Sequence, residues 1–358
     1  MRYARHIALQ EVGESGQQKL LNAKVLVIGA GGLGCPVLQY LTAAGVGTIG
    51  ILDGDTVDES NLQRQVLYTT TDIGRLKVEV AKERLNALNP DVSITIYPKN
   101  LVAENALAII EEYDLVIDGT DNFLTRYLVN DACVKLSKPF VYGAIHKFEG
   151  QVSVFNFNGG PTYRCLFPEE PSQSQIPNCA EAGVLGVLPG VIGTLQATEA
   201  IKIILGIGQP LSGKLKLTNL LSNSEETISF SRNEEQVSKA LQIELIDSYS
   251  NESCAISANV NPAELAQWIT DNRAINVLDV REAHEKPKLN HPNVISIPLG
   301  QVASHTTEIP VDQPLVVICQ HGIRSQHAIE FMKQYKFPNK LINLEGGMAA
   351  FHQHTSIL

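Results

Sequence analysis

The segment from residue 24 to residue 53 constrains the fold more than any other part of this chain. It begins with an apolar run rich in β-branched residues, 24–28, which is typical of a buried parallel strand. A glycine pattern, GxGxxG, follows directly, and residues 33–44 can then form a helix. A second apolar run, 46–52, ends at Asp53. Strand, glycine turn, helix and strand in this order predict a doubly wound, mainly parallel α/β sheet.

The glycine turn predicts a nucleotide-binding site. Gly29, Gly31 and Gly34 allow the backbone to approach phosphates, and the following helix presents unbonded N–H groups and the positive end of its dipole. Asp53 lies about 20 residues beyond the glycines, where a carboxylate can bind ribose hydroxyls. A purely structural turn is the alternative, since GxGxxG alone is a weak motif. The flanking strands and helix favour nucleotide binding.

Polar residues that follow the second and third predicted strands favour ATP over a dinucleotide. They are Asn61, Arg64 and Lys77, and then Asp121 with Asn122. Hydride transfer does not require such a set near the phosphates, but attack on the α-phosphate of ATP does. Cations hold the triphosphate and offset charge as pyrophosphate leaves, and a carboxylate can hold Mg²⁺. Charged surface loops are the alternative explanation for each residue taken alone.

Residues 1–230 resemble the MoeB/ThiF branch of the ubiquitin-activating enzyme superfamily, whose catalytic domain is Rossmann-like. The matching segments are Arg2-Tyr-Ala-Arg5, Gly29-Ala-Gly-Gly-Leu-Gly34, Asp53-Gly-Asp55, Ser60-Asn-Leu-Gln-Arg64, Lys77, Thr120-Asp-Asn122 and Cys179-Ala-Glu-Ala-Gly183. The resemblance implies an enzyme that adenylates the C-terminal Gly-Gly of a small ubiquitin-like sulfur-carrier protein, using ATP and Mg²⁺.

The resemblance also assigns roles to individual residues. Asp53 would bind the ribose, Asp121 would hold Mg²⁺, and Arg64 would act on the phosphates. Arg5 would reach the ATP of the other protomer in a homodimer. The residues implied at the nucleotide are Gly29, Gly31, Gly32, Gly34, Asp53, Ser60, Asn61, Leu62, Gln63, Arg64, Lys77, Asp121 and Asn122. Cys179 has two open interpretations: a nucleophile toward the acyl-adenylate, or a small buried residue at a helix start.

A second site is predicted near the end of the chain. The apolar run 314–318 predicts a strand, which leads into Cys319, a short loop, Arg324 and a helix over about 326–336. Loop amides, the helix dipole and an arginine together favour a thiolate or an attached negative sulfur. A buried structural cysteine is the alternative.

Residues 258–355 resemble a rhodanese-like domain, in which Cys319 would carry a persulfide and Arg324 would assist. Further matching segments are Val277-Leu-Asp279-Val-Arg281-Glu282 and Leu344-Glu-Gly-Gly347. Tyrosine phosphatases use a related loop that is one residue longer, and the shorter loop suits sulfur better than phosphate. The sulfur donor would be thiosulfate or a desulfurase that carries a persulfide.

Length and composition agree with two α/β domains. We expect an adenylyltransferase domain over 1–230, a linker over 231–257 and a rhodanese-like domain over 258–358. The net charge of −10 disfavours nucleic acid as a partner. The apolar stretch 184–205 contains charged residues and predicts a core helix, so no membrane partner is expected. Six scattered cysteines and no signal peptide indicate a cytoplasmic protein.

The sequence lacks a feature that many of these relatives have, which is a structural zinc site made by two CxxC pairs. The first pair here reads Thr162-Tyr-Arg-Cys165, and no cysteine lies near 229–236, where the second would fall. One cysteine cannot build a tetrahedral site, so we expect no zinc.

Three alternatives stay open at this stage. Carriers for molybdopterin, thiamine thiazole and tRNA thiolation are all activated by similar enzymes, and the sequence does not choose among them. A dinucleotide oxidoreductase would carry a flavin or nicotinamide. A non-catalytic scaffold would only bind a ubiquitin-like protein, and the presence of Asp121 and Cys319 argues against it.

Overall fold

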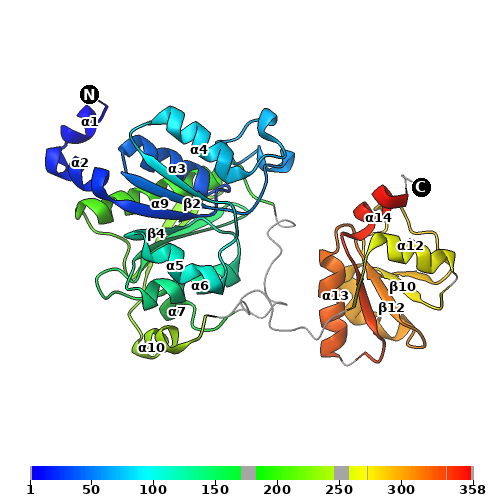
Figure 1. Cartoon of the computed structure of the whole chain (residues 1–358). Helices are drawn as coiled ribbons and strands as arrows, with labels where there is room; N and C mark the ends of the chain where they lie inside the picture. Colours follow the sequence, from blue (N-terminus) through cyan, green and yellow to red (C-terminus); the bar gives the residue numbers. More distant parts are fainter. Residues whose placement is uncertain (1, 171–182, 246–257, 272, 336, 356–358) are drawn as a thin grey trace. The chain divides into compact units, whose positions relative to one another are not determined.

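The computed structural model describes residues 2–170, 183–245, 258–271, 273–335 and 337–355. These residues form two compact units (Figure 1). Each unit has its own sheet and its own hydrophobic clusters, so each is described by itself.

The first unit is built on one eight-stranded sheet with the order β3-β2-β1-β4-β5-β6-β7-β8. In this spatial order, the five neighbouring strands from β3 through β2, β1 and β4 to β5 are parallel. The strands from β5 through β6 and β7 to β8 are antiparallel. The strands are β1 (Lys24–Ile28), β2 (Thr48–Leu52), β3 (Ser93–Tyr97), β4 (Leu115–Asp118), β5 (Phe140–His146), β6 (Glu149–Phe155), β7 (Lys214–Asn219) and β8 (Ser224–Ser229). The predicted doubly wound, mainly parallel sheet is confirmed.

Helices cover both faces of this sheet (Figure 1). They are α1 (Ala4–Ile7), α2 (Gly13–Asn22), α3 (Gly34–Ala44), α4 (Lys77–Leu88), α5 (Ala103–Glu111), α6 (Phe123–Lys135), α7 (Tyr163–Leu166), α9 (Leu188–Leu205) and α10 (Glu234–Gln242), with 3-10 helices η1 (Glu59–Asn61) and η2 (Thr70–Asp72). Alternate residues of β1 point into opposite cores: Val25 and Val27 pack with α3, α4 and α9, whereas Leu26 and Ile28 pack with α5 and α6.

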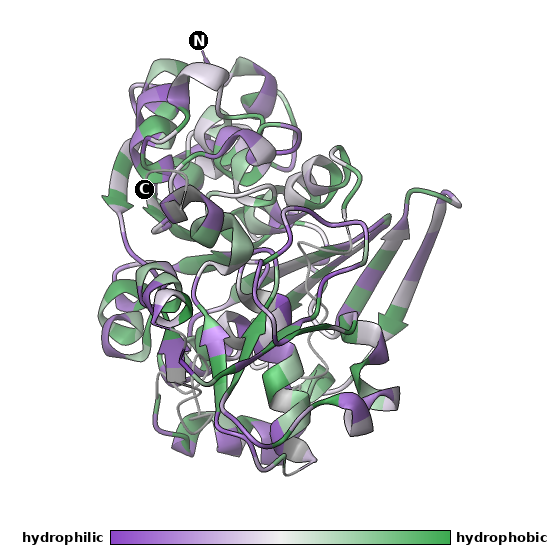
Figure 2. Cartoon of the chain, turned by 90° about the vertical axis from the view of Figure 1, so that its right-hand side faces the viewer, coloured by the Kyte–Doolittle hydropathy of each residue, from purple (hydrophilic) through white to green (hydrophobic). Residues whose placement is uncertain are grey.

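Hydropathy follows this layering in the buried strands, which are largely hydrophobic, whereas the helices and the outer strands mix hydrophobic and hydrophilic residues (Figure 2). Helix α9 is long and apolar enough to cross a membrane by length and composition alone. However, it contains the buried polar residues Gln196 and Glu199, and it packs on α3, β5 and β6. The expected core helix is therefore confirmed.

Helix α10 corrects the predicted linker. We expected residues 231–257 to join the domains, but 234–242 form a helix that packs on α6 and α7 of the first unit. Val237 and Ala240 are buried against Val134, and the Asn233 side chain caps the helix. Only these two residues of the helix are buried, so the segment has too few apolar positions to indicate a helix in the sequence.

The second unit has a five-stranded parallel sheet with the order β11-β10-β12-β13-β9. Its elements are β9 (Ala258–Val260), α12 (Pro262–Thr270), β10 (Asn276–Asp279), β11 (Val294–Ser296), η4 (Leu299–Ser304), η5 (Thr306–Glu308), β12 (Leu315–Ile318), α13 (Ile323–Gln334), β13 (Leu341–Leu344) and α14 (Gly347–Thr355). Helix α13 packs on one face, and α12 and α14 pack on the other. Helix α13 starts earlier than the expected residue 326, because Gly322 begins it with a left-handed φ of 90°.

Candidate functional site

A cavity of about 1060 Å³ lies in the first unit at the C-terminal ends of β1, β2 and β4. This is the edge where ligands bind in open parallel α/β sheets. Most of the residues expected at a nucleotide line it. They are Gly29, Gly31, Gly32, Asp53, Gln63, Arg64, Lys77, Asp121 and Asn122.

The glycine turn brings two strand ends close together. Gly29 has φ of 92°, and a Cβ there would lie 2.8 Å from the carbonyl oxygen of Gly119. A Cβ on Gly34 would collide with the carbonyl oxygen of Gly29. Gly34 therefore allows α3 to start against the end of β1, and this contact explains why Gly34 does not line the cavity.

Asp53 fixes the turn from the neighbouring strand. Its two carboxylate oxygens each accept a backbone hydrogen bond at 2.8 Å, one from Ala30 and one from Asp55. Burial raises the pKa of Asp53, and the Lys77 ammonium opposes that rise. The carboxylate is thus held in place where β2 ends, as ribose binding requires.

Lys77 and Arg64 provide the cationic side chains. Lys77 is 5% exposed, and its Nζ lies 2.9 Å from Oδ2 of Asp55, whose side chain is exposed. Arg64 donates to the carbonyl oxygen of Ser60 at 3.0 Å. A buried ammonium needs an anionic partner, so phosphate oxygens can replace Asp55 at Lys77.

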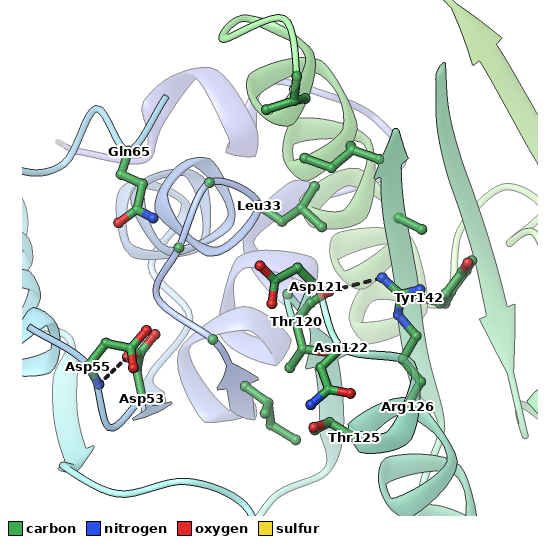
Figure 3. A pocket seen from close by; sticks show the side chains of 18 of the residues that line it. Leu33, Asp53, Asp55, Gln65, Thr120, Asp121, Asn122, Thr125, Arg126 and Tyr142 are labelled. Atoms are coloured by element: carbon green, nitrogen blue, oxygen red, sulfur yellow. Dashed lines mark hydrogen bonds between the residues drawn. The ribbon is translucent and has the colours of Figure 1, made fainter. Parts of the chain in front are cut away.

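The loop that carries Asp121 rests on a buried polar network. Thr120 donates to Oδ1 of the buried Asp118 from its backbone N–H (3.0 Å) and its hydroxyl (2.6 Å). Arg126 donates to the carbonyl oxygen of Thr120 at 3.1 Å. Burial raises the pKa of Asp118, and the Arg126 guanidinium opposes this rise. Asp121 and Asn122 are exposed on this fixed loop, and Figure 3 shows Asp121 directed toward the glycine turn.

The cavity lining also includes polar and aromatic residues that were not expected from the sequence, and Arg126, Tyr142 and Gln65 are three of them. Arg126 from α6 and Tyr142 from β5 form one wall, where the guanidinium carbon lies 5.3 Å from the centre of the ring. Gln65 lies near the glycine turn (Figure 3), and its buried Oε1 has no hydrogen-bond partner among the described residues. No local pattern marks these three residues, because only the tertiary fold brings them to the cavity.

Some expected residues lie elsewhere. Ser60, Asn61 and Leu62 do not line the cavity. Instead, Asn61 accepts from the backbone N–H of Asp58 and stabilises the turn that presents Arg64. Their contacts with a nucleotide stay predictions.

The two remaining residues expected in the first domain are Arg5 and Cys179. Arg5, on α1, is exposed and does not line the cavity of its own chain. Cys179 lies outside the described residues.

The donor set fits a hard cation beside a polyphosphate. Asp121 offers a carboxylate and Asn122 an amide oxygen, and such oxygen ligands suit Mg²⁺. The cationic side chains of Arg64, Lys77 and Arg126 line the same cavity, so it can hold a triphosphate together with a divalent cation.

The second candidate site is the loop after β12. Cys319 is buried, and its Sγ accepts hydrogen bonds from the Gly322 N–H at 3.1 Å and from the Ser325 hydroxyl at 3.3 Å. The Ser325 hydroxyl also lies 2.6 Å from Oδ1 of Asn343. Met348 donates its N–H to the carbonyl oxygen of Cys319 at 2.8 Å. The thiol therefore lies at the N-terminus of α13, in a loop that neighbouring elements hold.

Two arginines beside this loop are paired with carboxylates. Arg281 is fully buried and binds Asp279 through two hydrogen bonds of 2.9 Å. A third bond, of 3.1 Å, joins Arg281 to Gln320 in the loop. Arg324 binds Glu285 through two hydrogen bonds of 2.7 Å. Arg324 was expected to stabilise a negative sulfur on Cys319. In the structure its guanidinium also stabilises the carboxylate of Glu285.

Cys165 lies where relatives were expected to hold zinc. Its Sγ accepts backbone hydrogen bonds from Thr162 at 3.4 Å and Asn233 at 3.3 Å. It therefore joins the two segments that the CxxC pairs would have joined. Within the described ranges no group of three or more His, Cys, Asp or Glu residues could hold a metal ion. The absence of zinc stays a prediction.

Comparison with known proteins agrees with this arrangement. The ThiF family model matches residues 3–239, and the rhodanese-like domain model matches residues 261–354. The chain is 40% identical to the "Probable adenylyltransferase/sulfurtransferase MoeZ" of Mycobacterium tuberculosis, over 98% of this chain and 92% of that protein. It is 56% identical to the "Sulfur carrier protein adenylyltransferase" of Thermus thermophilus, over 65% and 88%.

A solved structure also resembles the first unit. The crystal structure of E. coli MccB with ATP is 25% identical, has a TM-score of 0.57, and covers 65% of this chain and 72% of that chain. From the family matches and the similarity along nearly its whole length, the chain belongs to the ThiF family and carries a rhodanese-like domain over residues 261–354.

Proposed function

We propose that this enzyme uses ATP to adenylate the C-terminal Gly-Gly of a ubiquitin-like sulfur-carrier protein, and that its rhodanese-like domain then supplies sulfur to form a thiocarboxylate. The chain is an adenylyltransferase with a sulfurtransferase domain, as its relatives are. The observation that carries the proposal is the single cavity in which the glycine turn, Asp53, Lys77 and Asp121 meet.

The cavity residues have distinct tasks in adenylation. Asp53 is positioned for the ribose, and Lys77 and Arg64 are positioned for the phosphates. The carrier carboxylate attacks the α-phosphate, and pyrophosphate leaves. Mg²⁺, when held by Asp121, would neutralise charge on the leaving group. A carboxylate is already ionised at neutral pH, so no general base is needed, and the protein contributes positioning and charge stabilisation.

Sulfur transfer then follows in two displacements. The terminal sulfur of a Cys319 persulfide attacks the acyl-adenylate carbonyl, the acyl–oxygen bond breaks, and AMP leaves with the bonding electrons. The product is an acyl disulfide between carrier and Cys319. A second thiol attacks the Cys319 sulfur and releases the thiocarboxylate, leaving a disulfide. Cys179 and a small cellular thiol are the two candidates for that second thiol.

The direct test is ATP–pyrophosphate exchange with purified carrier proteins from the molybdopterin, thiamine and tRNA-thiolation pathways. We expect exchange with a carrier that ends in Gly-Gly and only background exchange when its last glycine is removed, because the shortened tail no longer reaches the α-phosphate. The matched control is the same carrier with its full tail. Equal exchange with full and shortened carriers would exclude the proposed substrate.

We further propose that the enzyme is a homodimer whose ATP sites are completed by Arg5 of the other protomer. Its exposure on α1, outside its own cavity, supports this arrangement, and a guanidinium suits phosphate binding. Two inactive variants, Arg5→Ala and Asp121→Ala, test it. In a mixed dimer one site carries both defects and the other carries none, so exchange activity should return on mixing.

The measurement needs proof that subunits have exchanged, for example by differently tagged protomers. Each variant mixed with itself is the control. If subunit exchange occurs and activity does not return, Arg5 does not act across an interface.

A further inference from the structure

Glu285 forms an ion pair with Arg324, the arginine that follows the Cys319 loop. It lies 39 residues before Arg324 in sequence, yet it binds both terminal nitrogens of that guanidinium at 2.7 Å. The two parallel hydrogen bonds of a bidentate arginine–carboxylate pair fix its geometry and make it stronger than a pair with one hydrogen bond. Hydrogen bonding by Arg324 lowers the pKa of Glu285 to about 2. The carboxylate is therefore ionised at neutral pH.

Arg324 is next to the reactive sulfur through the chain. It is the second residue of α13, and Gly322, just before that helix, donates its N–H to the Sγ of Cys319. The other arginine that contacts the loop, Arg281, is bound by Asp279. The positive charge of each of these two arginines is therefore neutralised by a carboxylate that is bound to it.

We propose that Glu285 is a specificity-determining residue of the sulfur-transfer site, which disfavours dianionic sulfur donors such as thiosulfate relative to donors with one negative charge. The inference rests on the proposed sulfur transfer through Cys319. A fixed negative charge beside the binding site selects by repulsion, and the Coulomb energy grows with the charge of the donor.

The chemical step is the same for both donor classes. The Cys319 thiolate attacks the outer sulfur of thiosulfate, the sulfur–sulfur bond breaks, and sulfite leaves with the bonding electrons. Methanethiosulfonate reacts in the same way and releases methanesulfinate. Cyanide then removes the outer sulfur of the persulfide as thiocyanate and restores the thiolate. No oxidant or reductant is needed, so the donors differ mainly in charge.

The test is Glu285→Gln in the full chain, with thiocyanate formation measured for both donors. We expect kcat/KM to rise about tenfold for thiosulfate and about threefold for methanethiosulfonate, because the change in log rate scales with donor charge. The ratio of the two values should therefore rise about threefold. A smaller active fraction lowers both rates equally and leaves that ratio unchanged.

The matched control is Glu282→Gln, since Glu282 is exposed on the same segment and contributes only its backbone N–H to Glu285. Its donor ratio should change less than about twofold, because an exposed charge is screened. Three results would overturn the proposal: an unchanged donor ratio in Glu285→Gln, loss of activity with both donors in that variant, or an equal rise of the donor ratio in Glu282→Gln. Persistent sulfur transfer in Cys319→Ser would instead contradict the proposed function itself.

Discussion

Cys319→Ser is expected to abolish sulfur transfer from thiosulfate to cyanide and to leave ATP–pyrophosphate exchange unchanged. The serine oxygen can keep the hydrogen bonds of Gly322 and Ser325, but it cannot form a persulfide. Exchange should persist because its residues belong to the first unit and Cys319 to the second. Thiocyanate formation and pyrophosphate exchange, measured on one preparation, check both statements.

A suitable control for this substitution is Cys165→Ser, which removes a thiol from the first unit while keeping a hydrogen-bonding group beside Thr162 and Asn233. It should retain both activities. If Cys319→Ser loses both activities while remaining folded, the assignment of the two reactions to different units is wrong.

Asp121→Ala should lower the rate of pyrophosphate exchange by roughly 10²-fold or more, by analogy with loss of a preorganised charge-stabilising group. Asp121 is exposed to the cavity and is not part of a core, so its truncation should leave the fold intact. The variant should also need more Mg²⁺ for half-maximal exchange. Titration of Mg²⁺ in the exchange assay measures both effects.

Asp91→Asn is the matched control, because Asp91 is an exposed carboxylate that does not line the cavity. Its exchange rate and Mg²⁺ requirement should equal those of the unmodified enzyme. Full-rate exchange in Asp121→Ala would remove Asp121 from the proposed metal site.

Local sequence patterns predicted the parts of both sites that lie on short continuous segments. Strand β1 has the expected bounds, Lys24–Ile28, because both of its faces are buried and its run of apolar residues ends at a glycine turn. The strand, loop and helix around Cys319 were recognisable for the same reason. Within such segments, the chemistry and the conformation depend on neighbours in the chain.

Contacts between distant segments were not predictable in this way. Arg126 and Tyr142 come from different elements, and only the packing of α6 on the sheet brings them into one wall. The pairing of Arg324 with Glu285 likewise depends on tertiary structure. The sequence did not indicate helix α10 because only two of its residues, Val237 and Ala240, are buried, and its other contacts are hydrogen bonds from distant segments, such as that from Lys135 to the carbonyl oxygen of Leu241.

The separate cores have a thermodynamic consequence. Among the residues that the structure describes, the hydrophobic clusters of the first unit contain no residue of the second, and those of the second contain none of the first. Such a chain can unfold in more than one step, so one melting temperature does not define its stability. A calorimetric scan of Cys319→Ser therefore has to be resolved into its transitions, and only the one from the unit that contains β12 reports on that substitution.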